Sequence, residues 1–157
     1  MIMNNDKAIF PEVWSPKCTY ITKDEKYKYY YPIVIKCFDN VIQNKKTSAF
    51  FKGIGVKSIV LYAVNELSKY LCFDLENESN IYVNYICDKN ADKFPGTIYG
   101  KRIFDISYFC NDYKNSNVEK IVICNLLYEN EIVQDLMEGG VLLEDIILFP
   151  NVIYNLE

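Results

Sequence analysis

The feature that most restricts the fold is a series of short apolar segments, each followed by a segment with helical periodicity. Residues 57–62 and 120–124 are nearly continuous apolar runs, which is typical of strands buried on both faces of a parallel sheet. After the first run, leucines at every fourth position from Leu67 to Leu75 predict a helix over about 65–77. Strands that alternate with helices in this way build a parallel sheet.

The same alternation continues to the end of the chain. Further elements are expected as strands at 81–87, 102–104 and 145–149, as a short helix that Asp105 caps, and as a helix over about 129–138 that Gly139 and Gly140 end. Right-handed crossovers then give the strand order 3-2-1-4-5, counted along the chain. We therefore expect an α/β fold, a Rossmann-like open parallel sheet with helices on both faces, formed by residues 57–157 as one compact unit.

Residues 1–56 have a different texture and are expected to form an N-terminal arm and helices that pack on this core. Prolines and the charged cluster at 23–26 predict an extended arm over 1–26, with one short strand at 18–22. From Tyr30 to Ile42, apolar residues at helical spacing predict an amphipathic helix of about three turns.

A second, shorter helix is expected directly after this one. Thr47 or Ser48 can cap it, and Gly53 and Gly55 can terminate it. This helix would pack beside the strand at 57–62.

The composition excludes several kinds of chemistry. The chain has no histidine, so a Ser/His/Asp triad, a Cys/His pair and a histidine-containing zinc site are ruled out. The formal net charge is -4, which argues against a nucleic-acid partner because phosphates are bound by an excess of Lys and Arg. We identify no candidate catalytic residue and no candidate metal ligand.

Cellular location and cysteine chemistry follow from the same sequence. No apolar run reaches the roughly 18 residues of a membrane span, and the first residues do not resemble a signal peptide. We expect a cytoplasmic protein. Six cysteines are scattered without a CxxC pair, which favours small buried apolar side chains over disulfides or metal ligands.

The predicted sheet also predicts where a ligand would bind. Ligands of such sheets lie outside the carboxyl ends of the strands, where the strand order reverses. The turn at 62–68, Asp88 and Asn125 each follow a strand and are expected at this edge. Asp88 follows the turn by roughly twenty residues, the spacing of the acid that binds ribose hydroxyls in dinucleotide-binding domains. It can equally be part of a polar turn that leaves a buried strand.

The segments around this edge resemble a known family. Residues 59–71 (IVLYAVNELSKYL) are similar to the first strand, turn and helix of the Rossmann-type nucleotide-binding domains found with capsular polysaccharide and nucleotide-sugar biosynthesis proteins. Residues 84–92 (NYICDKNAD), 99–104 (YGKRIF) and 128–132 (YENEI) resemble later parts of the same pattern, which spans about 47–150.

The resemblance implies a nucleotide or nucleotide-sugar ligand, with NAD(P), coenzyme A or a nucleotide-sugar as the candidates. The implied binding residues are Ala63, Val64, Asn65, Glu66, Asp88, Lys89 and Asn125. A biosynthetic enzyme or a second copy of the chain is an expected partner.

The chain departs from the family at all three glycines of the turn, which are replaced by Ala63, Asn65 and Ser68. The side chain of Asn65 is expected where the pyrophosphate would lie, because the second glycine normally lets the backbone approach it. A smaller anion could still bind the N–H groups at the helix N-terminus. Glu66 would favour the helix dipole and repel a phosphate.

These observations lead to one main hypothesis and two alternatives. The main hypothesis is a non-catalytic Rossmann-like module, linked to surface-polysaccharide biosynthesis, that binds a nucleotide or nucleotide-sugar weakly or not at all. The first alternative is a protein-interaction or assembly module with residues 1–56 as the docking surface. The second is a small sugar-nucleotide transferase, using Asp88 or Asn125 at the sheet edge, or a dehydrogenase fragment.

Overall fold

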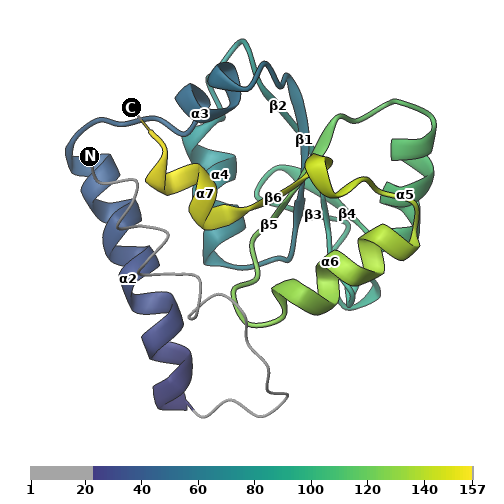
Figure 1. The fold of residues 1–157 in the computed structure, drawn as a ribbon, viewed down its shortest axis with the longest axis horizontal. Coiled ribbons are helices and arrows are strands. Elements are labelled where there is room, and N and C mark those ends of the chain that lie inside the picture. The colour runs from purple at the N-terminus through teal and green to yellow at the C-terminus, as the bar shows by residue number, and fades with distance from the viewer. Residues whose placement is uncertain (1–22, 157) are drawn as a thin grey trace.

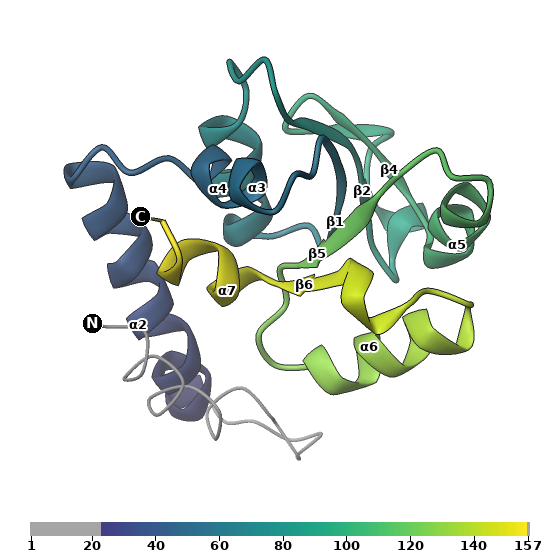
Figure 2. The same cartoon turned by 45° about the horizontal axis from the view of Figure 1, so that its top comes forward.

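The computed structural model describes residues 23–156, which form a central sheet covered by helices on both faces (Figures 1 and 2). The predicted strand at 18–22 lies outside the described residues. The strands are β1 (Ser58–Tyr62), β2 (Tyr82–Cys87), β3 (Thr97–Ile98), β4 (Lys101–Phe104), β5 (Lys120–Ile123) and β6 (Ile146–Leu148). The helices are α2 (Lys23–Ile42), α3 (Ser48–Gly53), α4 (Glu66–Asp74), α5 (Ile106–Lys114), α6 (Glu129–Glu138) and α7 (Phe149–Tyr154), with the short 3₁₀ segments η1 (Ala91–Lys93) and η2 (Leu143–Asp145).

The sheet has the strand order β3-β4-β2-β1-β5-β6. The five predicted strands are β1, β2, β4, β5 and β6; they are parallel and stand in the predicted order. The addition is β3, a two-residue strand that pairs antiparallel with β4 at the edge. Tyr99 and Gly100 join these two strands, both with positive φ, which is the geometry of a tight hairpin turn.

Successive side chains of the central strands point to opposite faces of the sheet and pack into two separate hydrophobic cores. Ile59 and Leu61 of β1 point to a cluster that includes side chains of α2, α3, α4 and α7. Val60 and Tyr62 of the same strand point to a second cluster with α5 and α6. Because both faces of the sheet are covered, β1 and β5 are apolar along nearly their whole length, which explains the continuous runs in the sequence.

The first described helix is longer than the sequence predicts. α2 begins at Lys23 instead of near Tyr30, so the expectation of an extended arm was wrong over 23–26. Asp24 and Glu25 lie in its first turn, where carboxylates are favoured by the helix dipole. Pro32 lies inside the helix and removes one backbone hydrogen bond without ending it.

The side of α2 that faces the protein is held by buried side chains and by one hydrogen bond to α7. Ile33 is fully buried, and the side-chain amide of Asn40 donates to the carbonyl oxygen of Ile153 in α7 at 2.9 Å. The hydroxyl of Thr47, expected as a helix cap, instead donates to Asp74 at 2.6 Å. This bond ties the start of α3 to the end of α4.

The predicted last strand was too long, because its final residue begins a helix instead. β6 ends at Leu148, and Phe149 opens α7, with Pro150 in the first turn. Proline fits the first turn of a helix, where its missing N–H leaves no hydrogen bond unmade. Phe149, Val152 and Ile153 are fully buried, so α7 contributes to the core that it shares with α2.

Two further expectations can be compared with the described residues. Five cysteines are free and buried, as predicted for small apolar side chains, and Cys18 lies outside the described residues. Within residues 23–156, no helix has both the length and the apolar character that crossing a membrane requires.

Candidate functional site

The turn after β1 lies at the carboxyl edge of the sheet, next to the ends of β2 and β5. The N–H of Ala63 donates to the carbonyl oxygen of Cys87 at 2.7 Å. Ala63 has φ 84°, a left-handed conformation that the first glycine of the family pattern would adopt without strain. Ala63 therefore holds, at the position of that glycine, a backbone conformation that favours glycine.

Asn65 caps α4 with its side chain. Its Oδ1 accepts hydrogen bonds from the N–H groups of Leu67 at 2.9 Å and Ser68 at 3.2 Å. The hydroxyl of Ser68 accepts in return from the N–H of Asn65 at 3.0 Å, completing a capping box. The residues at the second and third glycine positions thus bond to each other.

The same asparagine also bonds to the neighbouring strand β5, at the point where the strand order of the sheet reverses. Its Nδ2 donates to the carbonyl oxygen of Cys124, which follows β5, at 2.8 Å. This bond joins the turn after β1 to the end of β5. The Asn65 side chain therefore bridges the ends of β1 and β5, the place outside the strand ends where open parallel sheets commonly bind ligands.

Asp88 closes the turn from the side of β2. Its Oδ2 accepts from the N–H of Val64 at 2.9 Å, and its Oδ1 accepts from the N–H of Asn90 at 2.8 Å. Asp88 therefore stabilises the polar turn at the end of β2 and also bonds to the turn after β1. Both carboxylate oxygens have protein partners.

Taken together, four backbone N–H groups of this turn are bound by the chain's own side chains. The N–H groups of Val64, Asn65, Leu67 and Ser68 donate to Asp88, Ser68 and Asn65. A phosphate at a helix N-terminus is held by backbone N–H groups of this kind. An anion would have to displace these side chains in order to bind there.

The remaining predicted site residues do not join this arrangement. Glu66 is exposed and lies 3.8 Å from the ammonium of Lys69, a surface pair that contributes little to stability. Lys89 is exposed. Asn125 accepts from the N–H groups of Leu127 at 3.0 Å and Tyr128 at 3.1 Å, so its side chain forms the turn that leads into α6.

Glu129, the first residue of α6, is a buried acid that the sequence reasoning missed. It is 2% exposed, and its Oε1 has no hydrogen-bond partner among residues 23–156. Burial raises the pKa of Glu129 to about 9, so the carboxyl is protonated at neutral pH. A glutamate in the first turn of a helix is ordinarily a solvated charge that favours the dipole, and the sequence carries no signal of its burial.

Tyr85 and Lys89 have the sequence spacing of a catalytic tyrosine–lysine pair, but they do not lie on a helix. Tyr85 and Lys89 are four residues apart, the spacing at which a tyrosine and a lysine on one helix can form a catalytic pair. Tyr85 lies in β2, which ends at Cys87, and its hydroxyl donates to Asp112 at 2.8 Å. The two residues are therefore on a strand and the turn after it, not one turn apart on a helix.

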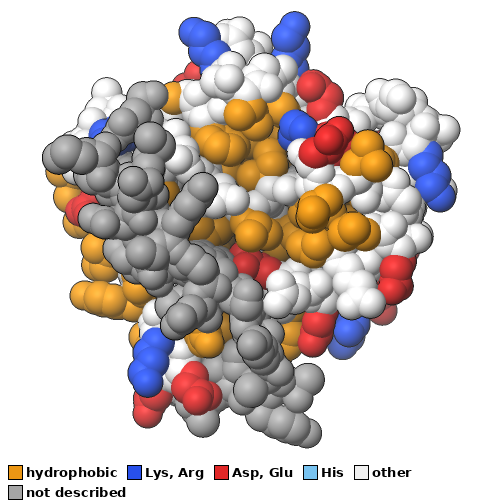
Figure 3. All heavy atoms as spheres, viewed as in Figure 1, with side chains coloured by type: hydrophobic (Ala, Val, Ile, Leu, Met, Phe, Trp, Pro, Cys, Tyr) orange, Lys and Arg blue, Asp and Glu red, His pale blue; other side chains and the backbone are white. Residues whose placement is uncertain are grey.

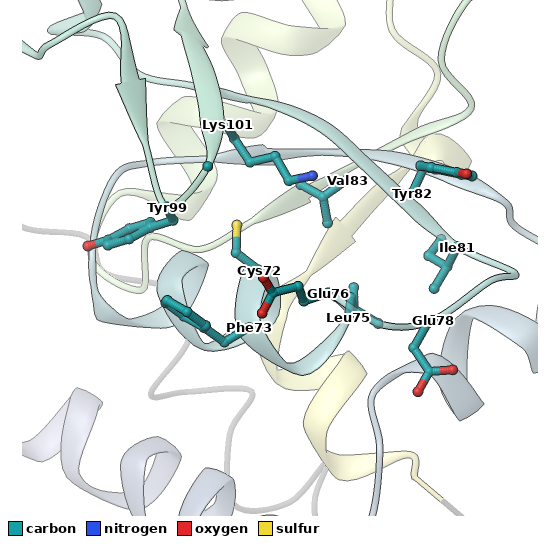
Figure 4. Close-up of a pocket in the computed structure, with 11 residues that line it drawn as sticks. Cys72, Phe73, Leu75, Glu76, Glu78, Ile81, Tyr82, Val83, Tyr99 and Lys101 are labelled. Carbon is teal, nitrogen blue, oxygen red and sulfur yellow. The ribbon is translucent and has the colours of Figure 1, made fainter.

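A cavity of about 350 Å³ lies away from the predicted site, near the amino ends of β2 and β4. Figure 4 shows Lys101 and Glu76 pointing toward it, with the ring of Tyr99 at one end. Within the described residues, no cluster of three or more Cys, Asp or Glu side chains could hold a metal ion.

The comparison with solved structures finds a match of low similarity. No protein-family model and no curated protein sequence matches the chain. Among solved structures, the UDP-D-quinovosamine 4-dehydrogenase from Vibrio fischeri aligns at 16% identity with a TM-score of 0.46. The alignment covers 55% of this chain and 74% of that one.

Proposed function

We propose that this chain is a non-catalytic Rossmann-like module in which its own side chains replace the ligand at the phosphate position. The observation that carries the proposal is the set of four bound N–H groups at the turn after β1. A dinucleotide or nucleotide-sugar must place its pyrophosphate on these groups. Binding of such ligands is therefore weak or absent.

The energetics support this reading. To admit a phosphate, the turn must break the hydrogen bonds of Asn65 and move the Asp88 carboxylate, which would repel the anion. Each bond to a partly buried group contributes about 1 kcal/mol. Losing several of them consumes much of the binding free energy that a nucleotide gains at this turn.

The link to surface-polysaccharide biosynthesis rests on the sequence resemblance of residues 59–71 and the segments after it. The module would then accompany enzymes of that pathway without performing their chemistry. A gene neighbourhood that contains glycosyltransferases would support this assignment, and neighbours from unrelated pathways would speak against it.

Calorimetric titration tests the binding part of the proposal. The full chain would be titrated with NAD, NADP, coenzyme A, a UDP-sugar and a CMP-sugar at millimolar concentration. We expect no saturable heat from any of them. Micromolar binding that is lost in an Asp88→Ala variant, but kept in a Glu131→Ala variant on exposed α6 surface, would contradict the proposal.

A second candidate function is protein association, and a separate observation favours it. The outward side of α2 carries seven large apolar side chains that are exposed. Large contiguous apolar patches on the surface of a protein mark interaction sites. In this function the sheet serves as a scaffold that presents α2.

A further inference from the structure

We infer that the exposed side of α2 binds the α2 helix of a second copy of this chain. The inference rests on the second candidate function, protein association. It does not depend on the proposal that side chains of the chain occupy the N–H groups at the turn after β1, which is called the closed phosphate position below. The residues of this surface, called the α2 face below, are Tyr27, Tyr31, Val34, Ile35, Phe38, Val41 and Ile42, each between 40% and 68% exposed.

The spacing of the α2 face is that of a helix-pairing seam. Tyr27, Tyr31, Val34, Phe38 and Val41 follow one another in alternating steps of four and three residues. A repeat of this kind averages 3.5 residues, and it keeps one apolar stripe in contact with a neighbouring helix along its length. An attached surface helix has no need of such a stripe on its solvent side.

A different stripe of α2 attaches the helix to its own protein. Ile33 and Cys37 are buried in the core, and Asn40 bonds to Ile153. The α2 face is therefore not a part of the internal packing that happens to reach the surface. Figure 1 shows α2 along one side of the molecule, and Figure 3 shows hydrophobic side chains along that side.

The α2 face continues into an apolar groove of about 250 Å³ between α2 and α4. Val34, Phe38 and Val41 of α2 line one wall. The other wall is formed by α4, with Leu67, Tyr70 and, as the one charged residue among the described residues of the lining, Glu66. An amphipathic helix binds to such a groove with residues at three- and four-residue spacing. The α2 face of a second copy supplies residues with this spacing.

The exposed area is sufficient for a dimer. Aromatic side chains bury roughly 150–250 Å² each, so the three rings of the α2 face leave on the order of 400 Å² open. With the four aliphatic side chains the face offers about 800 Å² per copy, which is the area per partner of a standard-size interface.

The chemistry of the seam favours a second copy over a different partner. A twofold dimer brings the same patch of both copies together, so the patch must complement itself. Between Tyr27 and Val41 the seam positions are all apolar and carry no charge. From Tyr27 to Val41 of α2 the two seams would contact over about 21 Å, with apolar side chains on both sides.

Sedimentation equilibrium of the full chain over a wide concentration range tests this inference. We expect a monomer–dimer equilibrium whose dissociation constant rises by about tenfold or more in Phe38→Glu and Tyr31→Glu, because each variant buries a charge in the seam. Tyr82→Glu is the matched control, since Tyr82 is 67% exposed at the start of β2. Circular dichroism checks the fold, and Val41→Lys is used if either variant unfolds.

Two results would overturn the inference. One is a wild-type monomer at all concentrations, which would leave residues 1–22 or a different protein as the occupant of the α2 face. The other is a dimer that the α2 variants do not weaken. Neither result affects the nucleotide titration, so the proposal of a closed phosphate position and the proposal of a dimer are tested independently.

Discussion

The carboxylate of Asp88 accepts a hydrogen bond from the N–H of Val64 at 2.9 Å. This bond joins the end of β2 to the turn after β1, at the edge where Rossmann-like sheets bind their ligands. The acid that the spacing suggests as a ribose partner thus has a partner within the chain. The side chains of Asp88 and Asn65 thus fix the turn after β1 to the ends of β2 and β5.

Replacing Asn65 tests how much this framework contributes to stability. Asn65→Ala removes the cap of α4 and the bond to Cys124, and we expect the free energy of unfolding to fall by about 1–3 kcal/mol. Urea denaturation would measure the loss. Asn65→Asp is the matched variant, because it keeps the capping oxygen and replaces the donor to Cys124 with a carboxylate oxygen. An Asn65→Ala variant as stable as wild type would contradict the role given to this side chain.

Glu129 makes stability depend on pH. Burial raises its pKa in the folded state to about 9 from an unfolded value of 4.5, so the folded state holds a proton that the unfolded state releases above pH 4.5. Its contribution to stability is full below that pH and is lost as the pH rises toward 9, by up to about 1.4 kcal/mol per pH unit. Glu129→Gln keeps a neutral side chain and removes this loss.

Thermal unfolding at pH 5 and pH 8 would measure the effect. We expect Glu129→Gln to be more stable than wild type at pH 8 and to differ little at pH 5. Glu131→Gln, on the exposed side of the same helix, is the control and should change neither. Equal pH dependence of wild type and Glu129→Gln would show that Glu129 is not a buried neutral acid.

The turn after α6 has no room for a side chain at Gly139. A Cβ built there would lie 2.4 Å from the sulfur of Cys110, which is buried beside α6. Gly139→Ala should therefore reduce the free energy of unfolding by about 1–3 kcal/mol, as overpacking does. Gly96→Ala is the control, because nothing lies within 4 Å of a Cβ at that position. Equal denaturation midpoints for the two variants would refute this.

The parallel sheet could be predicted because nearly continuous apolar runs are typical of strands that are covered on both faces. The strand order could be predicted because the crossovers between parallel strands are right-handed. The helix over Glu129–Glu138 was predicted with its true bounds, since the periodic residues end at two glycines. β3 could not be found, because two residues carry no periodicity. α7 was missed because Phe149, its first residue, continues the apolar run of the strand before it.

The candidate site could be located but its bonding could not. Loss of the turn glycines is visible in the sequence and indicates that Asn65 stands at the pyrophosphate position. The bond from Asn65 to Cys124 joins residues 59 positions apart, and only the packing of β1 beside β5 creates it. The burial of Glu129 likewise depends on tertiary packing, which no local pattern reports.

The most direct test of the closed phosphate position observes its N–H groups one by one. Amide signals of Val64, Asn65, Leu67 and Ser68 would be followed by two-dimensional NMR of the ¹⁵N-labelled chain during addition of a UDP-sugar or NAD to millimolar concentration. The hydrogen bonds to Asp88, Ser68 and Asn65 predict that these four signals stay in place. Saturable shifts of these signals, with smaller changes elsewhere, would contradict the proposal that the chain's own side chains occupy the phosphate position.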